Sequence, residues 1–137
     1  MEIVIADTGF VVALTNRSDQ KHNIVKDIYI RQPKILLPQT VLAEVAYLVG
    51  REAGISTVVK FLKGLSASRF LLVELNEQDI LRTAEILEEY ADSRIDFVDA
   101  SIMAIAERLN IETILALDRR DFSLFRPRHC DSFTLSP

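Results

Sequence analysis

Acidic residues follow two short apolar runs of the sequence, each at the position where the run stops. Asp7 comes directly after residues 3–6, and Asp118 comes directly after residues 113–117. Both runs consist mainly of β-branched and aliphatic side chains, which predicts buried strands. Because the carboxyl ends of parallel strands lie at one edge of a sheet, we expect these two carboxylates to lie close together.

Two further acids are predicted to reach the same edge from helices. Asp99 lies near the start of a segment rich in Ala, Ile and Met, which predicts a buried helix over residues 96–110. Glu44 lies in a predicted amphipathic helix over residues 40–52, after the apolar run at residues 34–38. A helix that follows a parallel strand begins at the carboxyl edge of the sheet. Four carboxylates therefore converge in this prediction: Asp7, Glu44, Asp99 and Asp118.

Carboxylates held close together repel one another and resist removal from water, so a protein that gathers them usually binds a hard cation there. Oxygen ligands alone suit Mg²⁺ or Mn²⁺. The two histidines, His22 and His129, fall outside the strand ends, so no zinc site is expected. A carboxylate-held Mg²⁺ most often serves phosphoryl or phosphodiester chemistry, and this is the chemistry that the sequence predicts.

Each of the four acids also has a structural alternative. Aspartate is a favoured helix cap, which is the alternative for Asp7, and it often opens a turn, which is the alternative for Asp118. For Glu44 the alternative is a solvated position on its helix, although this residue borders the apolar stripe. Each acid taken alone is a weak signal, so the functional hypothesis depends on the expected convergence of all four carboxylates.

Two neighbouring acids are interpreted mainly as helix caps. Asp96 and Asp99 form a D-x-x-D pattern, an acidic relative of the capping box, and we favour a capping role for Asp96. For Asp99 we favour a place in the site over capping alone. Asp121 is interpreted as the cap of a helix that begins at Phe122.

The order of predicted elements indicates an α/β domain. Helices and strands alternate along the chain, which predicts a parallel sheet with helices on both faces. No repeat or linker interrupts them, so residues 1–137 are expected to form one domain. The predicted strands cover residues 3–6, 34–38, 70–75, 113–117 and 132–135, and the predicted helices cover residues 8–16, 20–31, 40–52, 56–65, 76–90 and 96–110.

Composition narrows the class of protein further. About half of the chain is apolar (49%), which is enough to form a hydrophobic core. The net charge is −4, whereas proteins that bind nucleic acids are often basic, so the charge counts against nucleic-acid binding. No apolar run is long enough to span a membrane, and the first residues do not resemble a signal peptide. With a single cysteine, Cys130, there can be no internal disulfide, and we expect a cytoplasmic protein.

Four short segments, taken in order, resemble the motifs of the PIN-domain ribonucleases, which include the toxins of VapBC-type toxin–antitoxin pairs. Their order and spacing fit the family, and the match covers essentially the whole chain. Gly9 and Ala116 depart from it, since many members carry Ser or an aliphatic residue at the first position and Thr at the second. The matching segments are residues 5–8 (IADT), 42–45 (LAEV), 99–106 (DASIMAIA) and 115–118 (LALD), the last followed by residues 121–122 (DF).

The resemblance implies a Rossmann-like α/β/α sandwich and a metal-dependent endoribonuclease. It implies one or two Mg²⁺ or Mn²⁺ ions, and attack of a metal-activated water on a phosphodiester of single-stranded RNA. The implied catalytic and metal-binding residues are Asp7, Glu44, Asp99 and Asp118, and the candidate accessory residues are Thr8, Asp96 and Asp121. Candidate contacts to the RNA backbone are Arg119, Arg120 and Lys63, although for each of these three we favour a solvated surface position.

The resemblance also implies partners. Family members of this size commonly form homodimers, and many are silenced by a small antitoxin whose basic or aromatic side chain plugs the acidic site. The main alternative is a PIN module with weak or no catalytic activity that binds RNA or protein, to which Ala116 points. A thiol nucleophile at Cys130, beside His129, is a weaker alternative, because neighbours in sequence rarely face each other productively.

Overall fold

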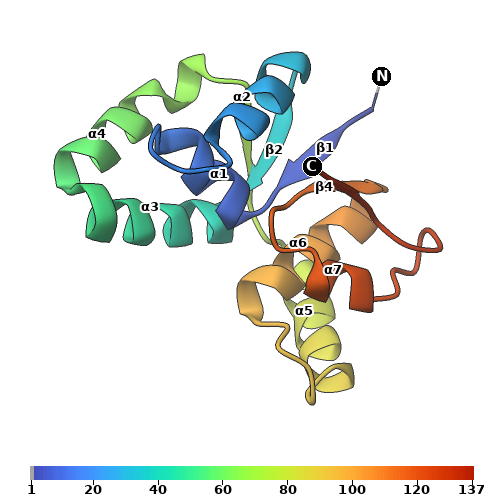
Figure 1. Cartoon of the computed structure of the whole chain (residues 1–137). Helices are drawn as coiled ribbons and strands as arrows, with labels where there is room; N and C mark the ends of the chain where they lie inside the picture. The colour runs from blue at the N-terminus through green and yellow to red at the C-terminus, as the bar shows by residue number, and fades with distance from the viewer. Residues whose placement is uncertain (1) are drawn as a thin grey trace.

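The computed structural model describes residues 2–137 and contains a five-stranded sheet in which all neighbouring strands are parallel (Figure 1). The strands are β1 (Val4–Ala6), β2 (Ile35–Pro38), β3 (Phe70–Val73), β4 (Thr113–Leu115) and β5 (Thr134–Ser136). Their order in the sheet is β3-β2-β1-β4-β5. β1 and β4 are therefore neighbours, and the residues that follow them emerge side by side.

Helices cover both faces of the sheet. Right-handed crossovers place the first four helices on one face and the last three on the other, and Figure 1 shows the two groups on either side of the strands. The predicted α/β sandwich with a central parallel sheet is confirmed. The helices are α1 (Thr8–Thr15), α2 (His22–Arg31), α3 (Gln39–Ala53), α4 (Ile55–Gly64), α5 (Glu77–Glu89), α6 (Phe97–Arg108) and α7 (Arg120–Leu124), with a 3-10 turn, η1, at Leu65–Ala67.

Two elements near the site differ from the sequence prediction. β4 ends at Leu115, two residues before the expected end of that strand. The short helix α7 begins at Arg120, two residues before the expected start at Phe122, because five residues are too few for periodicity to fix its start. Both differences change the path of the chain around Asp118, since α7 turns back against α6 directly after it.

The helix α6 lies at the centre of the core. Every residue from 100 to 106 is buried, as expected for a helix that is apolar on all sides. Its contacts with α3, α5 and α7 fix its first turn, where Asp99 lies. No helix within residues 2–137 is long and apolar enough to cross a membrane.

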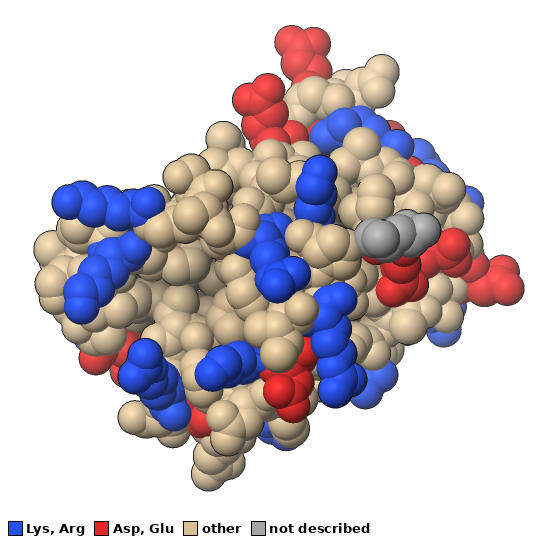
Figure 2. Space-filling view, turned by 90° about the horizontal axis from the view of Figure 1, so that it is seen from above, with Lys and Arg blue, Asp and Glu red and all other residues tan. Residues whose placement is uncertain are grey.

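A groove lies between α2 and α4, at the amino edge of the sheet. Its cavity of about 500 Å³ is lined by apolar side chains that include Phe61 and Phe70, and by the basic side chains of Arg17, Lys26 and Lys60. Figure 2 looks onto this edge and shows Lys and Arg side chains around a hollow. We refer to this cavity as the basic groove.

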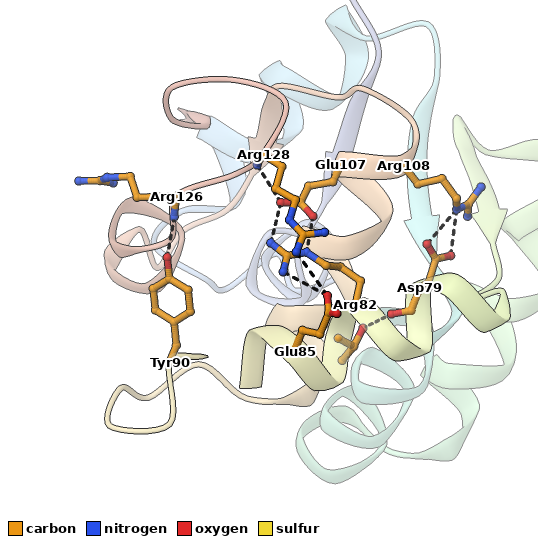
Figure 3. A network of polar contacts seen from close by, with 9 residues as sticks. Asp79, Arg82, Glu85, Tyr90, Glu107, Arg108, Arg126 and Arg128 are labelled. Atoms are coloured by element: carbon orange, nitrogen blue, oxygen red, sulfur yellow. Dashed lines mark hydrogen bonds and ion pairs between the residues drawn. The ribbon is translucent and has the colours of Figure 1, made fainter. Parts of the chain in front are cut away.

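Buried ion pairs join α5 to α6 and to the C-terminal segment (Figure 3). Arg82 donates two hydrogen bonds to Glu107, at 2.7 and 3.1 Å, and Arg108 pairs with the buried Asp79 at 2.9 Å. The backbone amide of Arg128 donates to the same Glu107 carboxylate at 2.9 Å. These contacts hold α5, α6 and the C-terminal segment together.

Candidate metal and phosphodiester site

A hollow of about 280 Å³ opens where β1 and β4 end and where α6 and α7 begin. Five aspartates, one arginine and one aromatic residue line it, so its surface is predominantly acidic. We refer to this hollow as the acid pocket. Its lining residues are Asp7, Arg94, Asp96, Asp99, Asp118, Asp121 and Phe122.

Asp7 lies directly after β1 and is only 8% exposed. It occupies the N-cap position of α1, yet its side chain accepts no capping hydrogen bond, so the capping alternative for Asp7 is wrong. Burial raises the pKa of Asp7 to about 6, opposed by the backbone amide of Thr8 and reinforced by the charges of neighbouring acids. An ionised carboxylate in such a place is stabilised by a bound cation.

Asp96 and Asp99 form a reciprocal capping box at the start of α6. The Asp99 amide donates to the Asp96 carboxylate at 2.9 Å, and the Asp96 amide donates to the Asp99 carboxylate at 3.2 Å. The predicted capping role of Asp96 is confirmed. Burial, and then the charge of Asp96, raises the pKa of Asp99 above its ordinary value. Asp99 thus combines a cap with a place in the acid pocket.

Asp118 and Asp121 reach the acid pocket from the β4–α7 connection. The Asp118 carboxylate accepts a hydrogen bond from the Arg120 amide at 3.2 Å, so it forms the predicted turn while it also lines the pocket. Asp121 is not the cap that the sequence predicted, because α7 begins one residue before it. Burial and the charge of Asp118 raise the pKa of Asp121, and the nearby Arg94 opposes that rise.

Glu44 does not line the acid pocket. It is half-buried on α3, and its charge contributes to the raised pKa of Asp7, so the two carboxylates lie near each other. A hydrogen bond of 2.7 Å between the hydroxyls of Thr40 and Ser101 joins the first turn of α3 to the second turn of α6. The structure therefore brings three of the four predicted acids together at the pocket and leaves the fourth beside it.

The basic residues named from the sequence have different surroundings. The Arg119 guanidinium donates to the Pro137 and Leu135 carbonyls at 3.2 and 3.4 Å, so it holds the C-terminal strand. Lys63 lies at the end of α4, where the chain returns to the amino end of β3, and this is the edge opposite the acids. Arg120 lies beside the acid pocket, in an adjoining hollow.

The donor set of the acid pocket suits a hard divalent cation. Within residues 2–137, no group of three acidic, histidine or cysteine side chains is arranged to enclose a metal ion. Mg²⁺, however, is commonly held by one or two carboxylates, with water and substrate phosphate as the other ligands. Beside Asp7, the Thr8 hydroxyl is buried and has no hydrogen-bond partner among residues 2–137. The carboxylates of the acid pocket that have raised pKa values, and the unpaired Thr8 hydroxyl, are compatible with such an ion.

The Cys130 thiol is a poor nucleophile in this fold. Burial and the charges of Glu112 and Asp131 raise its pKa. The His129 ring nitrogen Nε2 lies 2.6 Å from the Ile111 carbonyl, where it donates a hydrogen bond, so it cannot also accept the thiol proton. The thiol alternative is therefore wrong.

Comparison with known proteins identifies relatives that are similar in sequence over most of the chain. Ribonuclease VapC26 of Mycobacterium tuberculosis is 31% identical over 98% of this chain and 100% of its own length. The 23S rRNA-specific endonuclease VapC20 of the same organism is 28% identical over 88% of this chain and 92% of its own.

Solved structures of VapC proteins have a similar fold. The crystal structure of VapC20, described as a toxin that cleaves the sarcin–ricin loop, superposes with a TM-score of 0.78 at 23% identity, over 85% of this chain and 90% of that one. A chain of the Rickettsia felis VapBC2 complex, bound to a promoter DNA fragment, gives 0.70 at 18% identity, over 98% and 97%. The PIN domain model itself matches residues 4–126, and the chain therefore belongs to the PIN domain family.

Proposed function

We propose that this chain is a metal-dependent endoribonuclease and the toxin of a toxin–antitoxin pair. The observation that carries the proposal is the acid pocket, in which the buried Asp7 caps no helix and meets Asp99 and Asp118 at the carboxyl edge of the sheet. Relatives named as a ribonuclease and as a 23S rRNA-specific endonuclease support the same activity.

Mg²⁺ or Mn²⁺ at this pocket would supply an activated water and would offset negative charge on the phosphodiester. Asp7 and Asp99 are the residues that would hold the ion, with Asp118 and Glu44 as the remaining members of the quartet. Because Asp7 and Asp99 have raised pKa values, both must lose a proton before they bind a cation. Activity should therefore rise with pH through the range in which Asp7 ionises.

The proposed substrate is RNA in a single-stranded stretch or loop. Proteins that recognise RNA by sequence usually act on unpaired nucleotides, because a paired A-form helix hides its base edges in a deep groove. One structural neighbour is described as cleaving a loop of ribosomal RNA, which agrees with this substrate class.

The proposed partner in the basic groove is a small antitoxin, through a segment that carries apolar and acidic side chains. The groove is lined by apolar side chains, among them the half-buried Phe61 and the buried Phe70. Its basic residues Arg17, Lys26 and Lys60 are exposed and form no ion pair with other described residues. Neighbours solved as VapBC complexes support an antitoxin partner.

A homodimer is the proposed assembly. Apolar side chains remain exposed on the edge strand β3 and on α5, where Leu72 is 46% and Leu81 is 67% exposed. Surfaces of this kind are commonly covered by a partner chain. Light scattering at tens of micromolar checks the mass, and a monomer there contradicts the dimer.

The catalytic proposal is tested with Asp7→Asn and Asp99→Asn. Each substitution removes a charge and nearly preserves volume, so both variants should fold and should cleave an unstructured RNA at least 100-fold more slowly in Mn²⁺. Asp27→Asn, an exposed acid on α2, is the control and should cleave like the parent.

Two results would contradict the proposal. Full Mn²⁺-dependent cleavage by both variants removes the acids from the mechanism. RNA binding by the parent without any cleavage makes the chain a binding module, which is the alternative that Ala116 suggests.

A further inference from the structure

Arg94 is the one basic side chain that lines the acid pocket in the described part of the chain. It lies in the connection between α5 and α6, two residues before Asp96, which is the N-cap residue of α6. The other lining residues are five aspartates and Phe122. Nothing in the sequence marks Arg94, because a lone arginine in a loop is usually a solvated residue.

The backbone around Arg94 is held in place on both sides. The Ser93 hydroxyl donates to the Tyr90 carbonyl at 2.6 Å and accepts from the Ile95 amide at 3.2 Å. The Ile95 side chain is buried, and the Tyr90 hydroxyl accepts a hydrogen bond from the Arg126 amide at 3.0 Å (Figure 3). The loop therefore presents Arg94 to the pocket from a fixed position.

The Arg94 guanidinium has no hydrogen-bond or ion-pair partner among the described residues. Among residues 2–137 it forms no hydrogen bond and no ion pair, although it is close enough to Asp121 for its charge to oppose the rise in the pKa of that carboxyl. By contrast, Arg82 and Arg108 are paired with carboxylates, and Arg119 is bonded to two carbonyls. Five donors at the edge of the pocket remain available to a ligand.

We propose that Arg94 binds the phosphate of the RNA at the acid pocket and stabilises the charge that develops on it during cleavage. This inference rests on the proposed function. The aspartates repel a phosphodiester, so cations must hold it there. A guanidinium presents two parallel N–H groups that match two oxygens of one phosphate, and a donor aimed at developing charge lowers the barrier to reaction.

The adjoining hollow fits a continuation of the same RNA strand. It measures about 400 Å³, shares Arg94 and Asp121 with the acid pocket, and adds Arg120 between the α5–α6 connection and α7. Glu89 and Asp92 also line it, so the cationic contacts available to the strand there are Arg94 and Arg120. Arg94 stands between the two hollows and is placed to hold the phosphate at which they meet.

The test compares Arg94→Gln and Arg94→Lys with Arg31→Gln, an exposed arginine at the end of α2. Three quantities are measured: kcat and KM for an unstructured RNA in Mn²⁺, binding of the same RNA in Ca²⁺ by fluorescence anisotropy, and the rise in melting temperature on adding Mn²⁺. Arg94→Gln should lower kcat/KM about 100-fold, mainly through kcat, and should weaken RNA binding. Arg94→Lys should recover part of the loss, because it keeps the charge but not the fork.

The response to Mn²⁺ separates phosphate binding from a structural role. Loss of Arg94 removes a positive charge beside the aspartates, so the response to Mn²⁺ should be retained or increased. Cleavage by Arg94→Gln at the parental rate overturns the inference and leaves the proposed function standing. A loss of cleavage that accompanies a lost Mn²⁺ response also overturns it, since Arg94 would then only support the fold of the pocket.

A parent without nuclease activity removes the proposed function, and RNA binding then decides the inference by itself. Weaker binding by Arg94→Gln than by Arg31→Gln supports a phosphate contact at Arg94. Equal binding by the two variants overturns it.

Discussion

Asp7 occupies a helix N-cap position without acting as a cap. The pKa of about 6 corresponds to roughly 3 kcal/mol of unfavourable free energy at pH values well above 6, because the unfolded chain ionises the same carboxyl freely. The ionised Asp7 carboxylate therefore destabilises the fold without metal, and a purely structural role does not explain an aspartate at this position. Under the proposed function, a bound cation would offset this penalty.

Asp7→Asn should therefore melt higher than the parent in the absence of metal. The amide keeps the shape and removes the buried charge, and a net gain of about 1 kcal/mol corresponds to a few degrees in a domain of this size. Mn²⁺ should raise the melting temperature of the parent much more than that of the variant. If Asp7→Asn melts below the metal-free parent and responds to Mn²⁺ equally, Asp7 is a structural residue.

The dependence of stability on pH gives a second test at this residue. The folded pKa of Asp7 lies above its ordinary value of 3.8, so the folded state binds more protons between pH 3.8 and about 6. The contribution of Asp7 is therefore most favourable below pH 3.8 and is lost as pH rises through 6. The difference in unfolding free energy between parent and Asp7→Asn, measured without metal, should grow in favour of the variant from pH 4 to pH 7. A difference that is independent of pH contradicts the raised pKa.

Single residues of the site differ in how far the sequence reveals them. Asp7 and Asp118 could be predicted, because an apolar run that stops at an acid marks the carboxyl end of a strand. Asp121 was assigned to the wrong role, since its place depends on where a five-residue helix begins. Arg94 could not be predicted at all, because only the packing of the α5–α6 connection against α7 brings it to the pocket.

At the scale of elements, α6 links the core to the site. Its buried middle could be predicted from composition and its first turn from the D-x-x-D pattern, and both were confirmed. The ion pairs that join α5 to α6 had no sequence signal, because Arg82 and Glu107 are 25 residues apart. Long-range polar pairs depend on the tertiary arrangement, which local periodicity does not contain.

Glu107→Gln should destabilise the fold without changing the chemistry of the site. The substitution removes the closer and less exposed of the two carboxylates that pair with Arg82, whose side chain is only 12% exposed, and we expect a loss of about 2–3 kcal/mol. Chemical denaturation measures the loss, and cleavage assayed well below the melting temperature should remain at the parental level. Glu85→Gln is the control, because its pair with the same arginine is exposed and should contribute less than about 1 kcal/mol. Equal losses in the two variants would contradict this account.

At the scale of the whole molecule, the net charge of −4 hides two opposite regions. The aspartates gather at the carboxyl edge of the sheet, and Arg17, Lys26 and Lys60 line the groove at the amino edge. Under the proposed function, net charge is a poor guide to RNA binding, because an acidic site that holds a cation contributes negative charge to the total. The two regions should also respond independently to substitution, since they lie at opposite ends of the strands.

Reversing charge in the basic groove should separate neutralisation by an antitoxin from catalysis. The double variant Lys26→Glu with Lys60→Glu places two negative charges where an acidic segment is proposed to dock, and its affinity for the protein encoded beside this gene should fall at least tenfold. The loss should shrink as salt rises, because the charges are exposed and screened. RNA cleavage by the unbound variant should match the parent, since neither lysine lines the acid pocket. Lys63→Glu, an exposed residue of α4 that does not line the groove, is the matched control and should bind the partner normally. Normal binding by the double variant would place the partner elsewhere, and equal weakening by Lys63→Glu would reduce the effect to overall charge.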